Sequence, residues 1–453
     1  MPEETLRQLG QTHVARLLEA GSRFVSRERI AEDLEQLDLE LVRELLEGRG
    51  LYEEPAMVQV KPAAVVPASF ASSAEAGRYR THGEELLRQG RIAALVVAGG
   101  QGSRLGIEAP KGVVGVTPVR GKSLFQLHAE KVLALSRKYG SPVPLFIMTS
   151  RANNADTRAF FEEHSFFGLD PNEVFFFVQG MLPSITPEGR FILSRNCGLF
   201  MNPDGHGGTL KALKRSGCLE IMRTKGIEEI FYFQVDNPLV SICDPLFAGL
   251  HSLKGADMSS KVVRKKSFEE KVGVVAEVAG RTRVVEYSDM SDEMRYAVDP
   301  RGGMLNWAGS IAIHMIRRDF VEKLTTAGVR LPFHRAVKPI PSIDDEGHPV
   351  EVRGVKFEAF IFDALPLAGK TVTLEVLREH EFAPVKNRTG EDSLETSRAL
   401  QSDLHARWLN DLGIRVRKGA AVEISPLAAL EKDDLRRYAG ELPKEIEGDF
   451  YFE

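Results

Sequence analysis

The chain has 453 residues, of which 43% are hydrophobic and 27% charged, a composition typical of a globular protein of about three domains. Its net charge of −5 and pI near 6.2 argue against nucleic acid or a membrane surface as a partner. The N-terminal residues lack an apolar leader, and no apolar run has transmembrane length, so we expect a cytoplasmic protein. Three dispersed cysteines predict neither disulfides nor a zinc site.

The first 85 residues are predicted to form a helical region and a connector. Leucines and isoleucines recur at helical spacing over residues 3–50, among many charges, which predicts two or more amphipathic helices. Pro62, Pro67 and the small-residue run 68–76 then indicate a connecting segment. Neither part carries evident chemistry.

A glycine loop follows the first strongly apolar run. Residues 92–98 read as a strand buried on both faces, and the loop GGQGSRLG (99–106) with Pro110-Lys111-Gly112 comes directly after it. Glycines allow backbone N–H groups to approach an anion closely, and Arg104 and Lys111 add positive charge. The pattern favours a phosphate site, although an ordinary strand-to-helix turn has the same glycines.

Two familiar phosphate loops do not fit this stretch. A Walker loop ends in Gly-Lys-Ser/Thr, but in this sequence Gly106 is followed by Ile107 and not by lysine. A dinucleotide fold accepts Gly100 and Gly102 but wants glycine or alanine at Leu105. An arginine and a Pro-Lys placed several residues beyond the last tight glycine suit a longer phosphate tail.

Strands and helices alternate from Arg91 onward, which predicts an α/β fold with a parallel sheet. Ligands of such sheets collect at the carboxyl ends of strands, so Gln179 and Asp236 should face the same crevice as the glycine loop. The expected strands are 92–98, 144–149, 174–179 and 230–235, and the expected helices are 124–139, 154–163 and 210–224.

The later part of the chain changes character. Residues 272–278 and 281–290 predict an antiparallel pair turned at Ala279-Gly280, and 306–315 and 356–363 are further apolar segments. A helix around Leu394 to Leu404 and short apolar pieces near Val416, Val422 and Leu430 complete the chain. We divide the chain into a helical region (1–85), a catalytic domain (86–370) and a small C-terminal domain (371–453).

Two carboxylates are candidates for Mg²⁺, which takes few protein oxygens and leaves its other positions to phosphate and water. Asp236 ends the run IFYFQV, and Asp363 ends the run KFEAFIFD. Each also suits a structural role, since Asp-Asn-Pro is good capping and turn chemistry and Asp363 stands at an expected strand end. No serine or cysteine nucleophile has a partner at informative spacing, so covalent catalysis is disfavoured.

Three further features are weighed. The loop NPDGHGG (202–208) stands between two strand ends, where glycine backbone packed on a base and the Gln179 amide could read a nucleobase, although a bare turn is equally rich in glycine. Lys386 follows a proline-fixed apolar approach, although surface lysines are commoner. His314 and His334 are expected to be core or capping residues.

The ordered motifs resemble the UDP-sugar pyrophosphorylases, most closely the UDP-N-acetylhexosamine branch. The resemblance covers about Arg91 to Arg398. It implies a Rossmann-like α/β/α nucleotidyltransferase fold with a mixed sheet, like that of GT-A enzymes, a helical N-terminal region and a small C-terminal domain. The matching stretches are LVVAGGQGSRLG with PKG, VQGMLPSI, NPDGHGG, FQVDNPL, VVEYSDM, FHRAVK, KFEAFIFDAL and FAPVKN.

The resemblance also implies roles for individual residues. Catalytic cations would be Arg104, Lys111 and Lys386, and the metal ligands would be Asp236 with Asp363 as a possible partner. The nucleotide would lie against Gly99, Gly100, Gly102, Gln179, Gly205 and His206. The sugar pocket would be lined by Gly273, Glu286, Tyr287, Ser310, Phe360 and Phe362.

The implied activity is a Mg²⁺-dependent uridylyl transfer, in which UTP and a hexose 1-phosphate give a UDP-sugar and pyrophosphate. We expect N-acetylglucosamine 1-phosphate as the sugar, and a monomer or weak homo-oligomer. Ser103 replaces the family's usual threonine, and His206 and Ser310 stand where this branch has asparagine. A UDP-glucose or broad UDP-hexose pyrophosphorylase, or a non-catalytic nucleotide-sugar sensor, remains an alternative.

Overall fold

A computed structural model describes residues 1–53, 60–344 and 346–453. The chain forms two compact units that are both discontinuous in sequence. Unit 1 comprises Met1–Pro55, Gln179–Ala212 and Leu324–Asp363, and unit 2 comprises Ala56–Val178, Leu213–Lys323 and Ala364–Glu453. The predicted boundaries at 85 and 370 are contiguous cuts of the sequence, and that division stays a prediction.

Unit 2 is built on a ten-stranded mixed sheet, which confirms the predicted α/β class. Its central strands run in the order β7-β2-β3-β4 and are parallel, and β11 pairs antiparallel with β7. The carboxyl ends of the four parallel strands therefore share one edge. The sheet contains β1 (Val60–Pro62), β2 (Ile92–Val97), β3 (Leu145–Thr149), β4 (Val174–Val178), β7 (Glu229–Gln234), β8 (Met258–Arg264), β9 (Val274–Val278), β10 (Arg281–Val285), β11 (Ala308–Arg317) and β14 (Thr371–Glu375).

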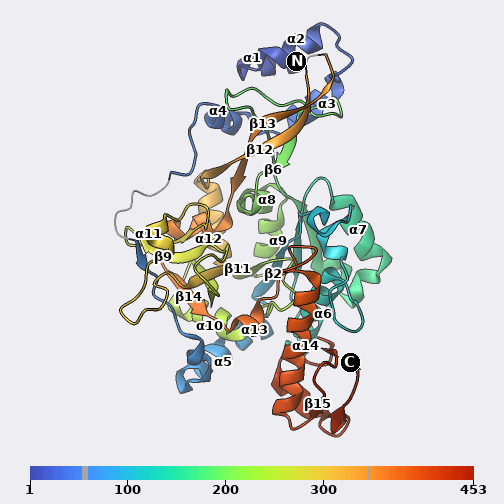
Figure 1. The fold of residues 1–453 in the computed structure, drawn as a ribbon, viewed down its shortest axis with the longest axis vertical. Coiled ribbons are helices and arrows are strands. Elements are labelled where there is room, and N and C mark those ends of the chain that lie inside the picture. Colours follow the sequence, from blue (N-terminus) through green and yellow to red (C-terminus); the bar gives the residue numbers. More distant parts are fainter. Residues whose placement is uncertain (54–59, 345) are drawn as a thin grey trace. The chain divides into compact units, whose positions relative to one another are not determined.

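Helices pack on this sheet around one large apolar core (Figure 1). The core joins side chains of β2, β3, β7 and β11 to those of α5, α6 and α10. His314 on β11 is fully buried with Nδ1 2.9 Å from the Ser260 hydroxyl, so it is a core residue as expected. The helices are α5 (Ala74–Arg88), α6 (Leu124–Tyr139), α7 (Asn154–Glu163), α9 (Cys218–Thr224), α10 (Pro245–Lys254), α11 (Asp292–Arg295), α13 (Arg378–Glu381) and α14 (Leu394–Asp411).

The C-terminal part of unit 2 has a small apolar core of its own, which includes Leu409, Val422, Ile424 and Leu435. Helix α14 leads into it, and its short strands gather near the C-terminus (Figure 1). The strands are β15 (Arg415–Val416), β16 (Val422–Ile424), β17 (Glu445–Ile446) and β18 (Phe450–Phe452).

Unit 1 combines four N-terminal helices with a long β-hairpin, so the predicted amphipathic helices are confirmed. Its hairpin pairs β12 with β13 over eleven residues on each strand. Helix α8 (Thr209–Arg215) and helix α12 (Arg318–Thr326) cross the boundaries between the units. The elements are α1 (Pro2–Gln8), α2 (Thr12–Glu19), α3 (Arg27–Glu35), α4 (Leu39–Leu46), β5 (Met181–Pro183), β6 (Met201–Pro203), β12 (Phe333–Ile343) and β13 (Pro349–Ala359).

Several sequence expectations need correction. The single helix expected over 210–224 is two helices, α8 and α9, because Gly217 takes a left-handed conformation with φ of 78°. The second strand expected over 281–290 ends at Val285. The connector expected over 68–76 already contains the start of α5, and β1 before it joins the sheet by pairing with β9.

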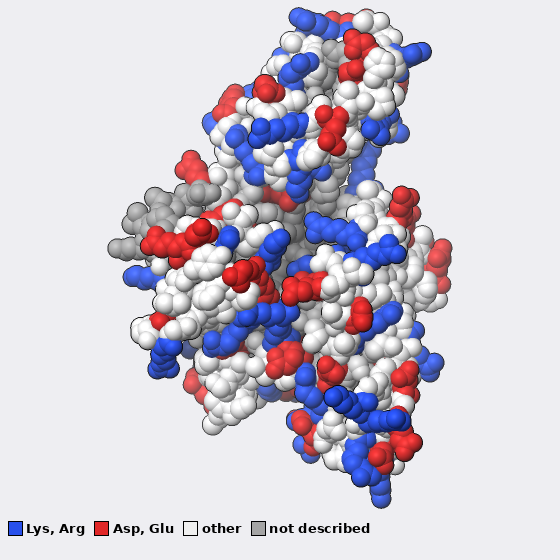
Figure 2. All heavy atoms as spheres, in the orientation of Figure 1, with Lys and Arg blue, Asp and Glu red and all other residues white. Residues whose placement is uncertain are grey.

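Both signs of charge are interspersed on the face drawn in Figure 2, in keeping with a net charge of −5. The three cysteines are free thiols, as expected. Within the described residues, none of the helices has the length and apolarity needed to cross a membrane.

Candidate active site

The first glycine loop leaves β2 at the sheet edge and closes on itself. Gln101 forms a bridge with Pro110, and the N–H of Gly102 donates to the carbonyl of Ala109 at 2.9 Å. The N–H of Lys111 donates to the carbonyl of Gly100 at 3.1 Å. These bonds fix the loop as a closed turn, which brings Lys111 back to the carboxyl end of β2.

A buried asparagine that the sequence reasoning missed supports this loop. Asn153 Nδ2 donates to the carbonyl of Ala98 at 2.8 Å, and its Oδ1 accepts from the N–H of Ser150 at 2.8 Å. Asn153 is fully buried, so both hydrogen bonds form away from water. Its side chain therefore joins the start of the glycine loop to the residue after β3.

The predicted phosphate and metal residues of unit 2 meet at the ends of β2 and β7. Lys111 Nζ lies 2.9 Å from Asp236 Oδ2, and both side chains are largely buried. Burial alone would raise the pKa of Asp236, but the ammonium groups of Lys111 and Lys386 hold it below its usual value. Asp236 is therefore ionised at neutral pH. Arg104 is exposed on the loop, and the described residues give it no ion pair.

A further cation, not noticed in the sequence, approaches the loop. Arg388 Nη1 is 3.9 Å from the position that a Cβ at Gly106 would take. Lys386, two residues earlier, lies 3.7 Å from Asp392. The only feature of the sequence that could have pointed to Arg388 is its place two residues after Lys386.

Helix α6 holds the end of β7 in place. His128 Nε2 donates to the carbonyl of Val235 at 2.9 Å, and Lys131 Nζ donates to the carbonyls of Pro238 and Val240 at 2.5 and 2.9 Å. Burial lowers the pKa of His128 to about 3 and that of Lys131 to about 7. The imidazole is therefore neutral, and it acts as a fixed donor beside Asp236.

Three of the predicted sugar residues come together in unit 2. The N–H of Ser310 donates to the carbonyl of Gly273 at 2.8 Å, and a Cβ on Gly273 would lie 2.9 Å from a carboxylate oxygen of Glu286. Tyr287 follows Glu286 and is 40% exposed. The contacts thus group Gly273, Glu286 and Ser310, and their role at a sugar stays a prediction.

The second glycine loop belongs to unit 1 and packs against the end of β13. A Cβ on Gly205 would lie 2.4 Å from the carbonyl oxygen of Ala359, and the φ of Gly205 is +86°. The N–H of Ala359 donates to the carbonyl of Asp204 at 2.8 Å, and the N–H of Asp204 donates to the carbonyl of Gly180 at 3.0 Å. Close backbone packing thus requires glycine at 205. Buried Gln179 precedes Gly180, and its role at a nucleobase stays a prediction.

An aromatic cluster in unit 1 contains three more predicted residues. The ring of His206 lies 5.2 Å from that of Phe360 and 5.7 Å from that of Phe362. His206 Nδ1 accepts from the N–H of Ile361 at 3.2 Å. Burial, with a smaller contribution from His334, lowers the pKa of His206 to about 4, so the ring is neutral at pH 7.

Asp363 does not stand at a strand end, contrary to the sequence reasoning. Strand β13 ends at Ala359, and Asp363 lies in a 3-10 helix over Ile361–Leu367. Its Oδ2 is 3.0 Å from His334 Nε2, and the His334 ring stacks on Tyr52 at 4.0 Å. Asp236 and Asp363 belong to different units, and a shared metal stays a prediction.

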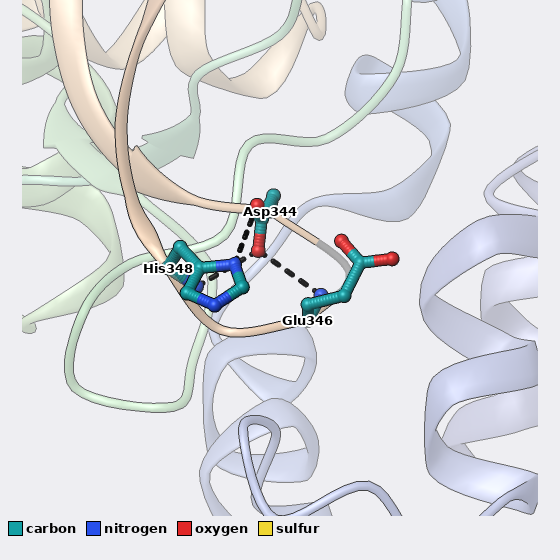
Figure 3. A group of neighbouring side chains, drawn as sticks. All are labelled: Asp344, Glu346 and His348. Carbon is teal, nitrogen blue, oxygen red and sulfur yellow. Dashed lines mark hydrogen bonds and ion pairs between the residues drawn. The ribbon is translucent and has the colours of Figure 1, made fainter.

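Another group of possible metal ligands lies at the turn between β12 and β13 (Figure 3). One oxygen of Asp344 accepts from the N–H groups of Glu346 and His348 at 3.0 and 2.8 Å. The other oxygen is 3.1 Å from His348 Nδ1. These bonds are the turn's own, so they account for the cluster without an ion.

A cavity of about 600 Å³ lies elsewhere in unit 2. Its wall includes Lys131 and Leu135 of α6, Leu239 of the loop after β7, and Gln401 and Trp408 of α14. None of the predicted site residues lines it. The candidate active site is therefore defined by the chemistry at the strand ends and not by this cavity.

The fold and the loop define a class. A mixed sheet with a closed glycine loop after its central strand is typical of α/β proteins that bind a nucleotide's phosphates, and here a lysine–aspartate pair lies at the same edge. Residues 54–410 match the UDPGP family, described as UTP–glucose-1-phosphate uridylyltransferase. The chain belongs to this family.

Individual relatives carry narrower names. The chain is 37% identical over 440 residues to UDP-N-acetylglucosamine diphosphorylase 1 of Arabidopsis thaliana, covering 91% of this chain and 84% of that protein. It is 36% identical over 403 residues to UDP-N-acetylglucosamine pyrophosphorylase of Saccharomyces cerevisiae, covering 85% and 84%. The crystal structure of the Trypanosoma brucei UDP-N-acetylglucosamine pyrophosphorylase superposes with a TM-score of 0.84 at 26% identity, covering 100% and 97%.

Proposed function

We propose that this protein transfers UMP from UTP to N-acetylglucosamine 1-phosphate, giving UDP-N-acetylglucosamine and pyrophosphate. The observation that carries the proposal is the Lys111–Asp236 pair, 2.9 Å apart at the edge of the sheet where the glycine loop also lies. Family membership and the names of the relatives support the reaction and the sugar.

The chemistry needs charge and position, with no nucleophilic side chain. A phosphate oxygen of the sugar phosphate forms a bond to the α-phosphorus of UTP, and the bond from that phosphorus to pyrophosphate breaks. The attacking phosphate is already ionised at neutral pH, so no general base is required. Arg104, Lys111 and Lys386 reduce the repulsion between the two anions and hold them in line.

A Mg²⁺ ion is part of the proposal. Asp236 is ionised and fits a cation that takes few protein oxygens. In the described residues, the only cluster of three potential ligands is the turn at Asp344, which belongs to unit 1 and not to the unit that carries Asp236. A single carboxylate agrees with an ion that would be completed by substrate phosphates and water. When bound, Mg²⁺ would neutralise charge on the leaving pyrophosphate.

The test is pyrophosphate release from UTP and Mg²⁺ with three sugars in parallel: N-acetylglucosamine, N-acetylgalactosamine and glucose 1-phosphates. We expect fastest release with the first. Faster release with glucose 1-phosphate would favour a UDP-glucose enzyme, the alternative suggested by His206 and Ser310. Tight UTP binding without release from any sugar would contradict the proposal and favour a nucleotide-sugar sensor.

Replacing Lys386 tests whether its ammonium takes part in the reaction. Lys386→Ala should lower kcat about 100-fold while the KM for UTP changes little, because this ammonium is proposed to act on charge in the transition state. Lys432→Ala, which removes a partly exposed lysine paired with Asp411, is the matched control. Wild-type turnover by folded Lys386→Ala would remove Lys386 from the mechanism.

A further inference from the structure

Two separate segments of unit 2 meet beside Asp236. The first follows β7 and contains Asp236 and Asn237, and the second begins with the last residue of α13, Glu381, and runs to Lys386. The side chain of Asn237 joins them, since Nδ2 donates to the carbonyl of Glu381 at 2.7 Å and Oδ1 accepts from the N–H of Ala383 at 3.0 Å. Asn237 is only 4% exposed, so both bonds form in a nearly dry environment.

The backbone continues this connection toward Lys386. The N–H of Val385 donates to the carbonyl of Asp236 at 2.8 Å, and the N–H of Lys386 donates to the carbonyl of Asp392 at 2.7 Å. The hydroxyl of Ser397 donates to the carbonyl of Ala383 at 2.6 Å. These hydrogen bonds at Ala383, Val385 and Lys386 therefore fix how the second segment lies against the end of β7 and the region around the start of α14.

A buried ion cluster anchors the far end of the second segment. Lys261 on β8 has no solvent exposure, and its Nζ lies 2.6 and 2.8 Å from the two carboxylate oxygens of Glu381 and 2.8 Å from Asp244. Asp244 also caps the N-terminus of α10 by accepting from the N–H of Leu246. Because breaking a buried ion pair is costly, this ion cluster holds Glu381 in a fixed position. The backbone carbonyl of Glu381 is therefore a fixed acceptor for the side-chain amide of Asn237.

The position of Lys386 matters electrostatically. Lys386 directly follows Val385, whose N–H is bonded to the carbonyl of Asp236, so the backbone that carries the ammonium is tied to the residue that carries the carboxylate. A misplacement of about 1 Å at a reacting centre can lower an enzyme's rate by as much as about 100-fold. Among the described residues, Asn237 is the only side chain of the first segment whose amide nitrogen and amide oxygen both bond to the backbone of the second segment.

We propose that Asn237 is a positioning residue that sets where the Lys386 ammonium stands relative to the Asp236 carboxylate. This inference rests on the proposed function, since it gives Lys386 its part in the transfer. Asn237 touches neither substrate nor metal in this account. It acts through the segment 381–386. An aspartate or an apolar side chain of the same size at position 237 would have no N–H group to donate to the backbone carbonyl of Glu381.

The first experiment measures placement without any substrate. Hydrogen exchange followed by mass spectrometry should show amides of residues 382–387 exchanging about tenfold faster in Asn237→Ala than in the wild type. Asn153→Ala is the matched control, because it removes another buried asparagine amide bonded to backbone and should loosen residues 98–102 instead. Unchanged exchange over 382–387 in Asn237→Ala would overturn the proposal.

The second experiment tests whether Asn237 acts through Lys386. A double-mutant cycle compares kcat for the wild type, Asn237→Ala, Lys386→Ala and the double variant at saturating UTP and sugar phosphate. We expect Asn237→Ala to lower kcat about tenfold in the wild-type background and less than about twofold when Lys386 is already absent. Equal losses in both backgrounds would indicate a merely structural residue and would overturn the proposal.

The two failures are distinguishable. A folded wild type that binds UTP and releases no pyrophosphate overturns the proposed function before any variant is compared. The exchange measurement still decides whether Asn237 fixes the segment that carries Lys386, because it uses no substrate.

Discussion

Lys111 and Asp236 lie 125 positions apart in sequence, yet the Nζ of one is 2.9 Å from Oδ2 of the other. The pair forms because β2 and β7 are adjacent parallel strands, and both residues follow the carboxyl ends of these strands. The pairing places an ionised carboxylate and a cation where a nucleotide's phosphates and a metal would meet.

We expect Asp236→Asn to raise the Mg²⁺ concentration for half-maximal rate by at least about tenfold, because a neutral amide is a poorer ligand for a hard cation. A Mg²⁺ titration of pyrophosphate release measures this. Asp433→Asn, which removes an exposed carboxylate paired with Arg436, should leave the titration unchanged. A wild-type titration for Asp236→Asn would contradict a ligand role.

Gly205→Ala should destabilise unit 1 by about 2–4 kcal/mol, because the added Cβ meets the Ala359 carbonyl and the residue keeps a positive φ. Urea unfolding followed by fluorescence measures the loss. Gly121→Ala is the control, since Gly121 also has a positive φ but has nothing within 4 Å of its Cβ position. If the two variants lose equal stability, the close packing of the loop against β13 is not the cause.

Acid should destabilise unit 2 through His128. In the unfolded chain this histidine binds a proton near pH 6.5, whereas burial lowers its pKa to about 3 in the folded protein. Between these values the unfolded state binds more protons, so the free energy of unfolding falls as pH falls, by up to about 1.4 kcal/mol per pH unit. Stability from this source is fully present above about pH 6.5.

The check is denaturant unfolding at pH 7.5, 6 and 5, conditions that bracket the upper part of this window. His128→Gln removes the titrating group, so its stability should depend less steeply on pH than that of the wild type. His348→Gln, at an exposed position of the β12–β13 turn, is the control. Equal slopes in wild type and His128→Gln would show that the acid sensitivity arises elsewhere.

Ser310→Asn should shift the choice of sugar. An amide at this position adds a hydrogen-bonding group beside Gly273 and Glu286, which the resemblance assigns to the sugar pocket. One hydrogen bond is worth about 0.5–1.5 kcal/mol, so the ratio of kcat/KM for N-acetylglucosamine 1-phosphate over glucose 1-phosphate should rise about 2- to 12-fold. The same assay on Ser267→Asn, an exposed serine, controls for a general effect, and an unchanged ratio would contradict a sugar contact at 310.

Local signals in the sequence predicted many elements of unit 2 closely. Helix α6 has the predicted bounds because Ser123 caps its first turn and Gly140 ends it in a left-handed conformation. Strands β2, β3 and β7 follow from short apolar runs that are buried on both faces, and β4 follows from an apolar run that is partly buried. The meeting of Lys111 with Asp236 followed from the rule that parallel strands end at one edge.

Other features depend on contacts that no local pattern reveals. Strand β12 was not predicted because Pro339 and Pro341 lie inside it, and a two-stranded hairpin tolerates prolines that a central strand does not. The role of Asn237 depends on residues 144 and 146 positions away. The resemblance named residues of both units, but the division of those residues between two discontinuous units appeared only in the structure.

The discontinuity of unit 1 has a consequence for synthesis on the ribosome. Helices α1–α4 emerge long before β12 and β13, which belong to the same unit and end only at Ala359. At about 5–20 residues per second the helices wait roughly 15 to 60 s for their partners. Contacts such as the ion pairs of Arg330 with Glu40 and Glu44 form only after the later segment has been made. The folding of unit 1 is therefore completed only after more than half of the chain has been made.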